Sequence, residues 1–233
     1  VPAAEPARHP LLAVGLQLGP LAPRVVVERT VHQRFELGAQ LATERHRERG
    51  AHAHVVQPIF FPGGDIGRLA VSGTVNDLAM MGATDAVMLT LAVVIEEGFA
   101  RADLARIAAS IRLACEEAGV RIMTGDTKVM GRGELDGIIL TTSGVGLTAR
   151  VVTDRGLAPG DRILVTGTMG DHGLAVLAAR GNLALEVELR SDVAPVNGLV
   201  RAALAAGGDA ITAMKDPTRG GLASALHELA AKA

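Results

Sequence analysis

Glycines surround an Asn-Asp pair between Phe61 and Ala83, in a stretch whose other residues are mostly apolar. Asp65, which follows a Pro-Gly-Gly turn, is a plausible N-cap for a helix that continues to about Met81. Asn76 and Asp77 fall inside that helix. Aspartate is a poor helix former and is seldom buried without a partner, so Asp77 indicates a functional site that supplies one, such as a cation or a phosphate-metal complex.

The composition is that of an ordinary globular protein. Hydrophobic residues make up 48% of the 233 residues, which is enough for one large or two modest domain cores. With 23 basic and 25 acidic side chains, no overall field favours nucleic acid or an anionic membrane as a partner. No apolar run reaches about 18 residues and no secretion signal is evident, which predicts a cytoplasmic protein. The single cysteine, Cys115, excludes a disulfide framework and is expected to be a buried packing thiol.

The first 54 residues differ from the rest of the chain. They contain five of the seven histidines and show little periodicity, so we interpret them as an atypical, solvated segment. His52 and His54, two positions apart, could face one side of a strand and hold a metal, although no third ligand is evident.

From Val55 onward the pattern of apolar and turn residues predicts alternating strands and helices. Strands are expected at 55–61, 86–95, 120–123, 138–147 and 162–166, and helices at 65–81, 104–118, 173–180, 197–206 and 220–232. A polar glycine-rich loop is expected at 124–133. These elements predict an α/β fold with an N-terminal domain at 55–151 and a C-terminal domain at 152–233, which we expect to be incomplete because its last helix runs into the chain end.

Three separated clusters combine acidic side chains with glycine backbone, and two of them also carry Lys and Arg. Carboxylate oxygens, cations and open backbone N–H groups are what a nucleotide triphosphate with Mg²⁺ requires. No Gly-Lys-Ser/Thr sequence is present, which excludes a Walker A loop. The candidate binding residues are Asp65, Asn76, Asp77, Gly125, Asp126, Thr127, Lys128, Arg132, Lys215 and Asp216.

Each candidate also has a structural alternative. These are a helix cap for Asp65, a solvated lysine for Lys128, a surface arginine for Arg132 and a turn pair for Lys215 and Asp216. Two histidines, His172 in a glycine turn and His227 on a predicted helix, are candidate acid-base groups. His172, flanked by glycines, is the better candidate, whereas His227 is expected to be a core or rim residue.

Four ordered motifs resemble the hydrogenase maturation factor HypE (carbamoyl dehydratase) family, which belongs to the PurM-like, AIR synthase-related superfamily. The motifs are Phe-Phe-Pro-Gly-Gly-Asp through Asn-Asp-Leu-Ala at 60–79, Thr-Gly-Asp-Thr-Lys-Val at 124–129, Thr-Thr-Ser-Gly-Val-Gly at 141–146 and Lys-Asp-Pro-Thr-Arg-Gly-Gly-Leu at 215–222. Together they cover the chain from about Val55 to Ala233.

The resemblance implies a two-domain PurM-like fold. Its N-terminal mixed sheet with flanking helices would form a homodimer, and ATP would lie between the domains near the subunit interface. The implied reaction is ATP-dependent dehydration of a carbamoylated C-terminal cysteine to a thiocyanate, with Mg²⁺ on the phosphates. The product cyanide would reach the iron of a [NiFe] hydrogenase through maturation partners, namely the carbamoyltransferase HypF and the HypC-HypD complex.

By the same resemblance, Asp77, Asp126 and Asp216 correspond to metal- and phosphate-binding acids, and Lys128 to the catalytic cation near the transferred phosphate. The chain departs from the family before Val55: the family has a Thr-Asp-Ser-Tyr-like strand here, so one metal-binding Asp has no counterpart. The family's terminal cysteine would lie beyond Ala233. The alternatives are an inactive HypE-like scaffold, or a sibling enzyme such as selenide water dikinase or thiamine-phosphate kinase.

Overall fold

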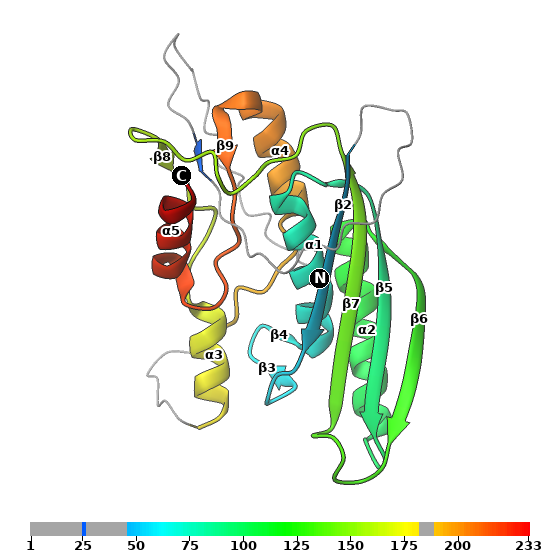
Figure 1. Cartoon of the computed structure of the whole chain (residues 1–233). Coiled ribbons are helices and arrows are strands. Elements are labelled where there is room, and N and C mark those ends of the chain that lie inside the picture. Colours follow the sequence, from blue (N-terminus) through cyan, green and yellow to red (C-terminus); the bar gives the residue numbers. More distant parts are fainter. Residues whose placement is uncertain (1–24, 27–45, 182–188) are drawn as a thin grey trace, which may run out of the picture.

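The computed structural model describes residues 25–26, 46–181 and 189–233. Its larger sheet has four strands in the order β2-β7-β5-β6 (Figure 1). These strands are β2 (His46–His54), β5 (Asp85–Glu96), β6 (Arg121–Met130) and β7 (Ile138–Thr148). β5 and β6 run parallel, whereas β7 is antiparallel to both β5 and β2, so the sheet is mixed as predicted.

Two helices, α1 (Ile66–Met80) and α2 (Arg101–Ala118), cover one face of this sheet (Figure 1). Their side chains share one core with the inward residues of β5 and β7. Along β5, Leu89 is fully buried while its neighbour Met88 is 46% exposed, as expected for a sheet covered on one side. Cys115 lies buried on α2, which confirms its predicted packing role.

Helix α1 is buried on nearly all sides because it lies between the sheet, α2 and α4 (Asn197–Gly207). Its close approach to the sheet depends on Gly144 in β7. A Cβ atom at Gly144 would lie 2.8 Å from side-chain carbons of both Leu78 and Leu89. The glycine therefore serves the packing of α1 on the sheet.

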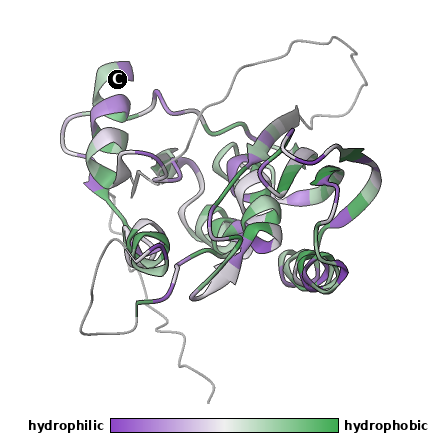
Figure 2. Cartoon of the chain, turned by 90° about the horizontal axis from the view of Figure 1, so that it is seen from below, coloured by the Kyte–Doolittle hydropathy of each residue, from purple (hydrophilic) through white to green (hydrophobic). Residues whose placement is uncertain are grey.

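A second, smaller part of the molecule lies beside this layer and contains short parallel strands. Its sheet has the order β8-β1-β9, formed by β8 (Arg162–Ile163), β1 (Val25–Val26) and β9 (Ile211–Ala213). The remaining elements are the short strands β3 (Phe60–Phe61) and β4 (Gly64–Asp65), the helices α3 (Asp171–Ala179) and α5 (Gly221–Lys232), and a 3-10 turn at Gly208–Ala210. Coloured by hydropathy, both parts carry apolar stretches on their helices and strands (Figure 2). A second core around Val152, Val200 and Met214 includes Met80 of α1, so the two parts pack against each other.

The five predicted helices are confirmed in position, but two predicted strands are too long and one predicted loop is wrong. The segment 55–61 is strand only at Phe60–Phe61, because Pro58 has no N–H to donate to a ladder. The predicted strand at 162–166 is limited to Arg162–Ile163. The predicted loop at 124–133 is largely strand, since β6 continues to Met130 and pairs with β5 throughout.

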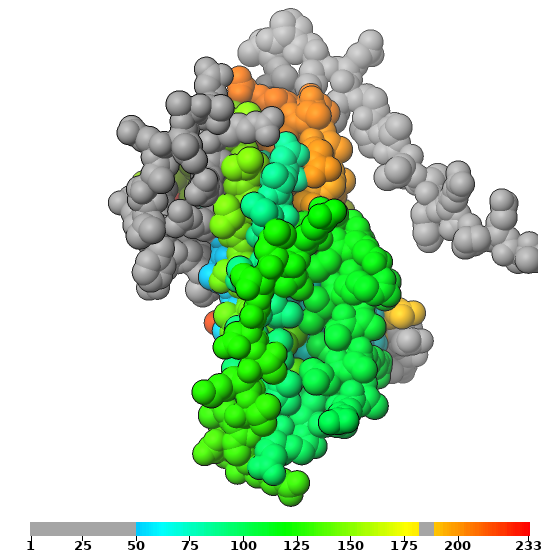
Figure 3. Space-filling model, turned by 90° about the vertical axis from the view of Figure 1, so that its right-hand side faces the viewer, coloured from blue at the N-terminus to red at the C-terminus, as the bar shows by residue number. Residues whose placement is uncertain are grey.

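Residues 46–54 are also strand rather than irregular, and β2 pairs with β7 along its whole length. None of the helices in the described part of the chain is long and apolar enough to cross a membrane. α2 and β6 lie at the molecular surface on the side seen in Figure 3.

Candidate functional site

Asp77 is buried in α1, and its partner is another side chain of this protein. The Nε2 atom of His52 lies 2.5 Å from Oδ2 of Asp77, and the two side chains are 18% and 8% exposed. His52 projects from β2 toward α1, because alternate residues of a strand share a face and the neighbouring residues Ala51 and Ala53 are exposed. The pair therefore connects the edge of the sheet to the last turn of the helix.

The charges around this pair converge from three elements. The hydrogen bond to Asp77 raises the pKa of His52 against the opposing effect of burial, and the negative charges of Asp77 and Asp216 add to the increase. Burial raises the pKa of Asp216 to about 6, with further upward contributions from Asp77 and Asp192 and a downward one from His52. Two carboxylates, Asp77 and Asp216, thus act on the imidazole of His52, and Asp192 acts on Asp216, where the C-terminal part meets α1.

His54 lies beside His52 but is held in the core. Its ring centroid is 5.6 Å from that of His52, and its Nε2 is 3.3 Å from Oγ1 of Thr142. Burial first, and then the charge of His52, lower the pKa of His54 to about 4. The two histidines face one side of β2, as predicted, and His54 is a neutral packing residue there.

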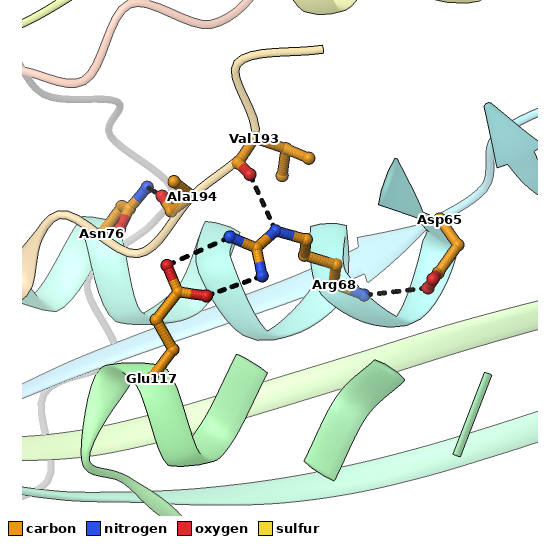
Figure 4. Close-up of polar contacts among 6 residues, drawn as sticks. All are labelled: Asp65, Arg68, Asn76, Glu117, Val193 and Ala194. Carbon is orange, nitrogen blue, oxygen red and sulfur yellow. Dashed lines mark hydrogen bonds and ion pairs between the residues drawn. The ribbon is translucent and has the colours of Figure 1, made fainter. Parts of the chain in front are cut away.

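Asp65 and Asn76 have structural partners. Oδ1 of Asp65 accepts hydrogen bonds from the backbone N–H groups of Gly67 at 2.7 Å and Arg68 at 3.1 Å, which confirms its N-cap role. Figure 4 shows the bond from Arg68. Asn76 uses both ends of its amide on the segment before α4. Its Nδ2 donates to the carbonyl of Ala194, and its Oδ1 accepts from the N–H of Val196.

The candidates of the second cluster lie on the exposed edge strand β6. Gly125 allows β5 to approach, because a Cβ atom there would lie 2.2 Å from the carbonyl oxygen of Leu91. The residues that follow it, Asp126, Thr127 and Lys128, are all exposed, and Oδ1 of Asp126 accepts the N–H of Thr127. β6 and β2 are at opposite edges of the sheet, roughly 14 Å apart at three interstrand spacings. This cluster therefore does not join the His52–Asp77 pair within one chain.

Arg132 and Lys215 also have partners of their own. Arg132 lies in the turn after β6 beside Glu96, whose pKa is lowered mainly by hydrogen bonds from the N–H groups of Gly133 and Gly137 and further by the Arg132 charge. Lys215 is 5% exposed and its ammonium donates to Glu228 of α5. The structure thus brings Asp77 and Asp216 together and leaves Lys215 in a separate ion pair.

His172 acquires a partner that the sequence did not reveal. Its Nδ1 is 3.0 Å from Oγ of Ser191, and its backbone N–H donates to Oδ1 of Asp192. Burial lowers the pKa of His172, against the raising effect of Asp192. Because Asp192 also acts on Asp216, the start of α3 borders the same charged region.

The three predicted metal ligands do not form a ready ion site. Within the residues that the structure describes, no group of three or more His, Cys, Asp or Glu side chains is arranged to hold a metal. Asp77 faces an imidazole, and Asp126 lies on the far edge strand. The residues present therefore do not fit a preformed Mg²⁺ site.

Sequence reasoning missed two residues of the charged region, His52 as the partner of Asp77 and Asp192. A signal for His52 was present, since two histidines two positions apart share a strand face. Asp192 carried no comparable signal, because it lies in a segment without regular secondary structure between α3 and α4.

Comparison with known proteins places the chain in a protein family. The family model described as AIR synthase related protein, N-terminal domain, matches residues 50–148, and the model of the C-terminal domain matches 158–233. The chain therefore belongs to the AIR synthase-related family and has its PurM-like α/β fold, as predicted.

Within this family the chain is similar to carbamoyl dehydratase HypE. It is 49% identical to HypE of Rhizobium leguminosarum bv. viciae over 181 residues, which are 77% of this chain and 51% of that protein. The solved HypE-HypF complex matches with a TM-score of 0.77 at 46% identity, covering 80% of this chain and 61% of the other. Hydrogenase maturation protein HypE in complex with ATP matches with a TM-score of 0.77 at 41% identity, covering 87% and 59%. The chain spans about half the length of the curated relatives it matches.

Proposed function

We propose that this chain forms the nucleotide-binding part of a HypE-type carbamoyl dehydratase, which uses ATP to dehydrate a carbamoylated cysteine to a thiocyanate. The observation that carries the proposal is the buried His52–Asp77 pair on α1, with Asp216 of the C-terminal part acting on both residues and Asp192 acting on Asp216. A relative of the same fold has been solved with ATP, which supports nucleotide as the ligand. The division into domains at 55–151 and 152–233 stays a prediction.

The start of α5 supplies groups that suit a phosphate. Its N-cap, Gly220, has the left-handed φ of 80° and contributes no side-chain capping bond, so the first N–H groups of the helix have no cap from that residue. Helix N-termini of this kind bind anions through their N–H groups and dipole. Asp216 lies in the loop that leads into this helix, which supports the third motif as part of a phosphate site.

The chemistry requires removal of an amide oxygen, which leaves poorly by itself. Transfer of a phosphoryl group to that oxygen turns it into a good leaving group, and a nearby cation stabilises the charge that develops. We assign this role to Lys128. The assignment of Asp126 and Asp216 as Mg²⁺ ligands stays a prediction.

Because Asp126 and Lys128 cannot reach the charged region of their own chain, we infer that the protein acts as a homodimer. The face of the sheet opposite α1 carries exposed apolar side chains, including Met88 and Met123. A second copy that covers this face would bring its own β6 toward the nucleotide. Sedimentation of the purified chain would test this, and a monomer at all concentrations would contradict it.

We further propose HypF and the HypC-HypD complex as partners and the cytoplasm as the location. The first partner is supported by the relative that was solved as a HypE-HypF complex.

Calorimetric titration of ATP with Mg²⁺ into the chain tests the nucleotide site. Lys128→Ala is expected to weaken binding about tenfold, which corresponds to about 1.4 kcal/mol for a lost charge-assisted contact. Arg121→Ala is the matched control, since Arg121 is an exposed cation on the same strand. Equal affinities of the Lys128 variant and the control would contradict the assignment.

One observation favours the alternative of an inactive scaffold: Asp77, the acid that the family motif offers to a metal, is paired with His52. ADP formation from ATP by the purified chain, measured with and without a peptide that ends in a carbamoylated cysteine, separates the two. Nucleotide binding without turnover would support the scaffold.

A further inference from the structure

The contact between His52 and Asp77 has a consequence for metal binding that is specific to this chain. A metal ligand must offer an oxygen lone pair to the ion at about 2.0–2.2 Å for Mg²⁺ or Mn²⁺-sized cations. Oδ2 of Asp77 instead has an imidazole nitrogen at 2.5 Å. We propose that His52 excludes divalent cations from Asp77, so that Asp77 serves as one half of an internal histidine-carboxylate pair and not as a metal ligand.

The position of His52 is fixed by the sheet. β2 is antiparallel to β7, and His52 is in register with Thr142. An antiparallel ladder on this side leaves the side chain little freedom to move along the strand, because a shift by one residue would turn it to the other face. His52 therefore returns to Asp77 whenever β2 is paired.

The space around the imidazole is also limited. His54 lies on the same face of β2, its ring centroid 5.6 Å away, and is packed so closely on α1 that a Cβ atom added to Gly73 would lie 3.0 Å from its Cε1. With His54 on one side and α1 in front, His52 cannot leave Asp77 toward the core. The 18% exposure of His52 leaves only the solvent side open.

The surrounding charges explain why the pair forms. Asp77 is 8% exposed, and an ionised carboxylate at such a position requires a hydrogen-bond donor or a cation. Asp216 and Asp192 add negative charge nearby, which would favour a bound cation at the same place. His52 supplies the donor from within the chain, and an ion would have to displace it first.

This inference concerns the site of the proposed function but does not depend on nucleotide, so it is tested with Mn²⁺ alone. Binding of Mn²⁺ to the 233-residue chain would be measured by electron paramagnetic resonance at fixed pH without ATP. Wild type and Asp77→Asn are expected to bind equally weakly, within twofold. His52→Asp places a second carboxylate beside Asp77 and is expected to bind Mn²⁺ at least tenfold more tightly, and the Asp77→Asn change in the same chain should abolish that gain.

His52→Gln and His227→Ala are the controls. Glutamine keeps a donor toward Asp77 and is expected to match wild type, and His227 is an exposed histidine on α5 far along the chain from this pair. The proposal is overturned if Asp77→Asn weakens Mn²⁺ binding tenfold from wild type, a comparison that requires no variant of His52, or if His52→Asp folds and shows no gain. If the chain did not bind ATP, the proposed function would be contradicted. The Mn²⁺ titrations would still test this inference, because they are made without ATP.

Discussion

Residues 193–196 lie along α1, where Arg68 and Asn76 bind the backbone of this segment (Figure 4). Asn76 makes two of these contacts. Its two hydrogen bonds, 3.0 Å to the carbonyl of Ala194 and 2.8 Å from the N–H of Val196, are made by a residue that is 8% exposed. We predict that Asn76→Ala lowers the free energy of unfolding by about 2–4 kcal/mol. Two buried backbone groups lose their partners, and each such loss costs about 1–3 kcal/mol, reduced where water enters.

Urea unfolding of wild type and variant, together with hydrogen exchange at the Val196 amide, measures this effect. Asn76→Asp keeps the acceptor for Val196 but places an oxygen against the Ala194 carbonyl, so it should destabilise at least as much. Glu97→Ala, at an exposed turn position, is the control. It should change the free energy of unfolding by less than about 0.5 kcal/mol, as is usual for surface sites. An Asn76→Ala protein with wild-type stability and a protected Val196 amide would refute the anchoring argument. If that protein instead differed from wild type only in weaker ATP binding, Asn76 would be assigned to the nucleotide site.

Three further predictions concern packing and charge. Gly144→Ala should cost about 1–3 kcal/mol in urea unfolding, since its Cβ would meet three side chains within 3.0 Å, whereas Gly198→Ala in α4, with nothing within 4 Å, should be neutral or stabilising. Glu228→Gln should lower the free energy of unfolding by about 1–2 kcal/mol at pH 7, because it leaves the ammonium of Lys215 buried without its carboxylate. The hydrogen bond from Lys215 lowers the pKa of Glu228. The stability difference between wild type and variant should therefore vanish as pH falls below the ordinary pKa of a glutamate. The pKa of Asp216 is about 6 in the folded protein against an ordinary 3.8, so the free energy of unfolding should decline as pH rises through this window. Asp216→Asn should remove this decline, which is worth up to about 3 kcal/mol at pH 7.5. A wild-type stability that rises from pH 4 to 6.5 would contradict this prediction.

The helices could be predicted because their signals are local. The cap at Asp65 lies at the start of α1, and the apolar spacing of α2 lies within α2 itself. Each signal is sufficient to define its own helix. The two edge strands could not be predicted in the same way. β6 is exposed along most of its length, so its sequence lacks the buried face that marks a strand, and the Gly-Asp in its middle has the composition of a turn. Charged residues in the first half of β2 had the same effect.

For the site, the sequence predicted which carboxylate is unusual but not what satisfies it. Asp77 could be recognised as buried from the apolar residues around it. Its partner His52 is 25 residues away on a strand whose existence the local pattern did not reveal, and the pairing depends on the sheet register. Asn76 illustrates the opposite case, because a motif residue that resembles a ligand is used here to hold a neighbouring segment.

The pairing of β2 with β7 also bears on the order in which the molecule assembles. β5, α2, β6 and β7 follow one another directly, whereas β2 precedes them, and its contact between His54 and Thr142 spans 88 residues. During synthesis β2 leaves the ribosome long before the strand that it pairs with, so its loop closes late and at a larger entropic cost. Until β7 has been made, Asp77 lacks the register that brings His52 to it. The charge pair at the centre of the site is therefore one of the last contacts that the N-terminal half of the fold can form.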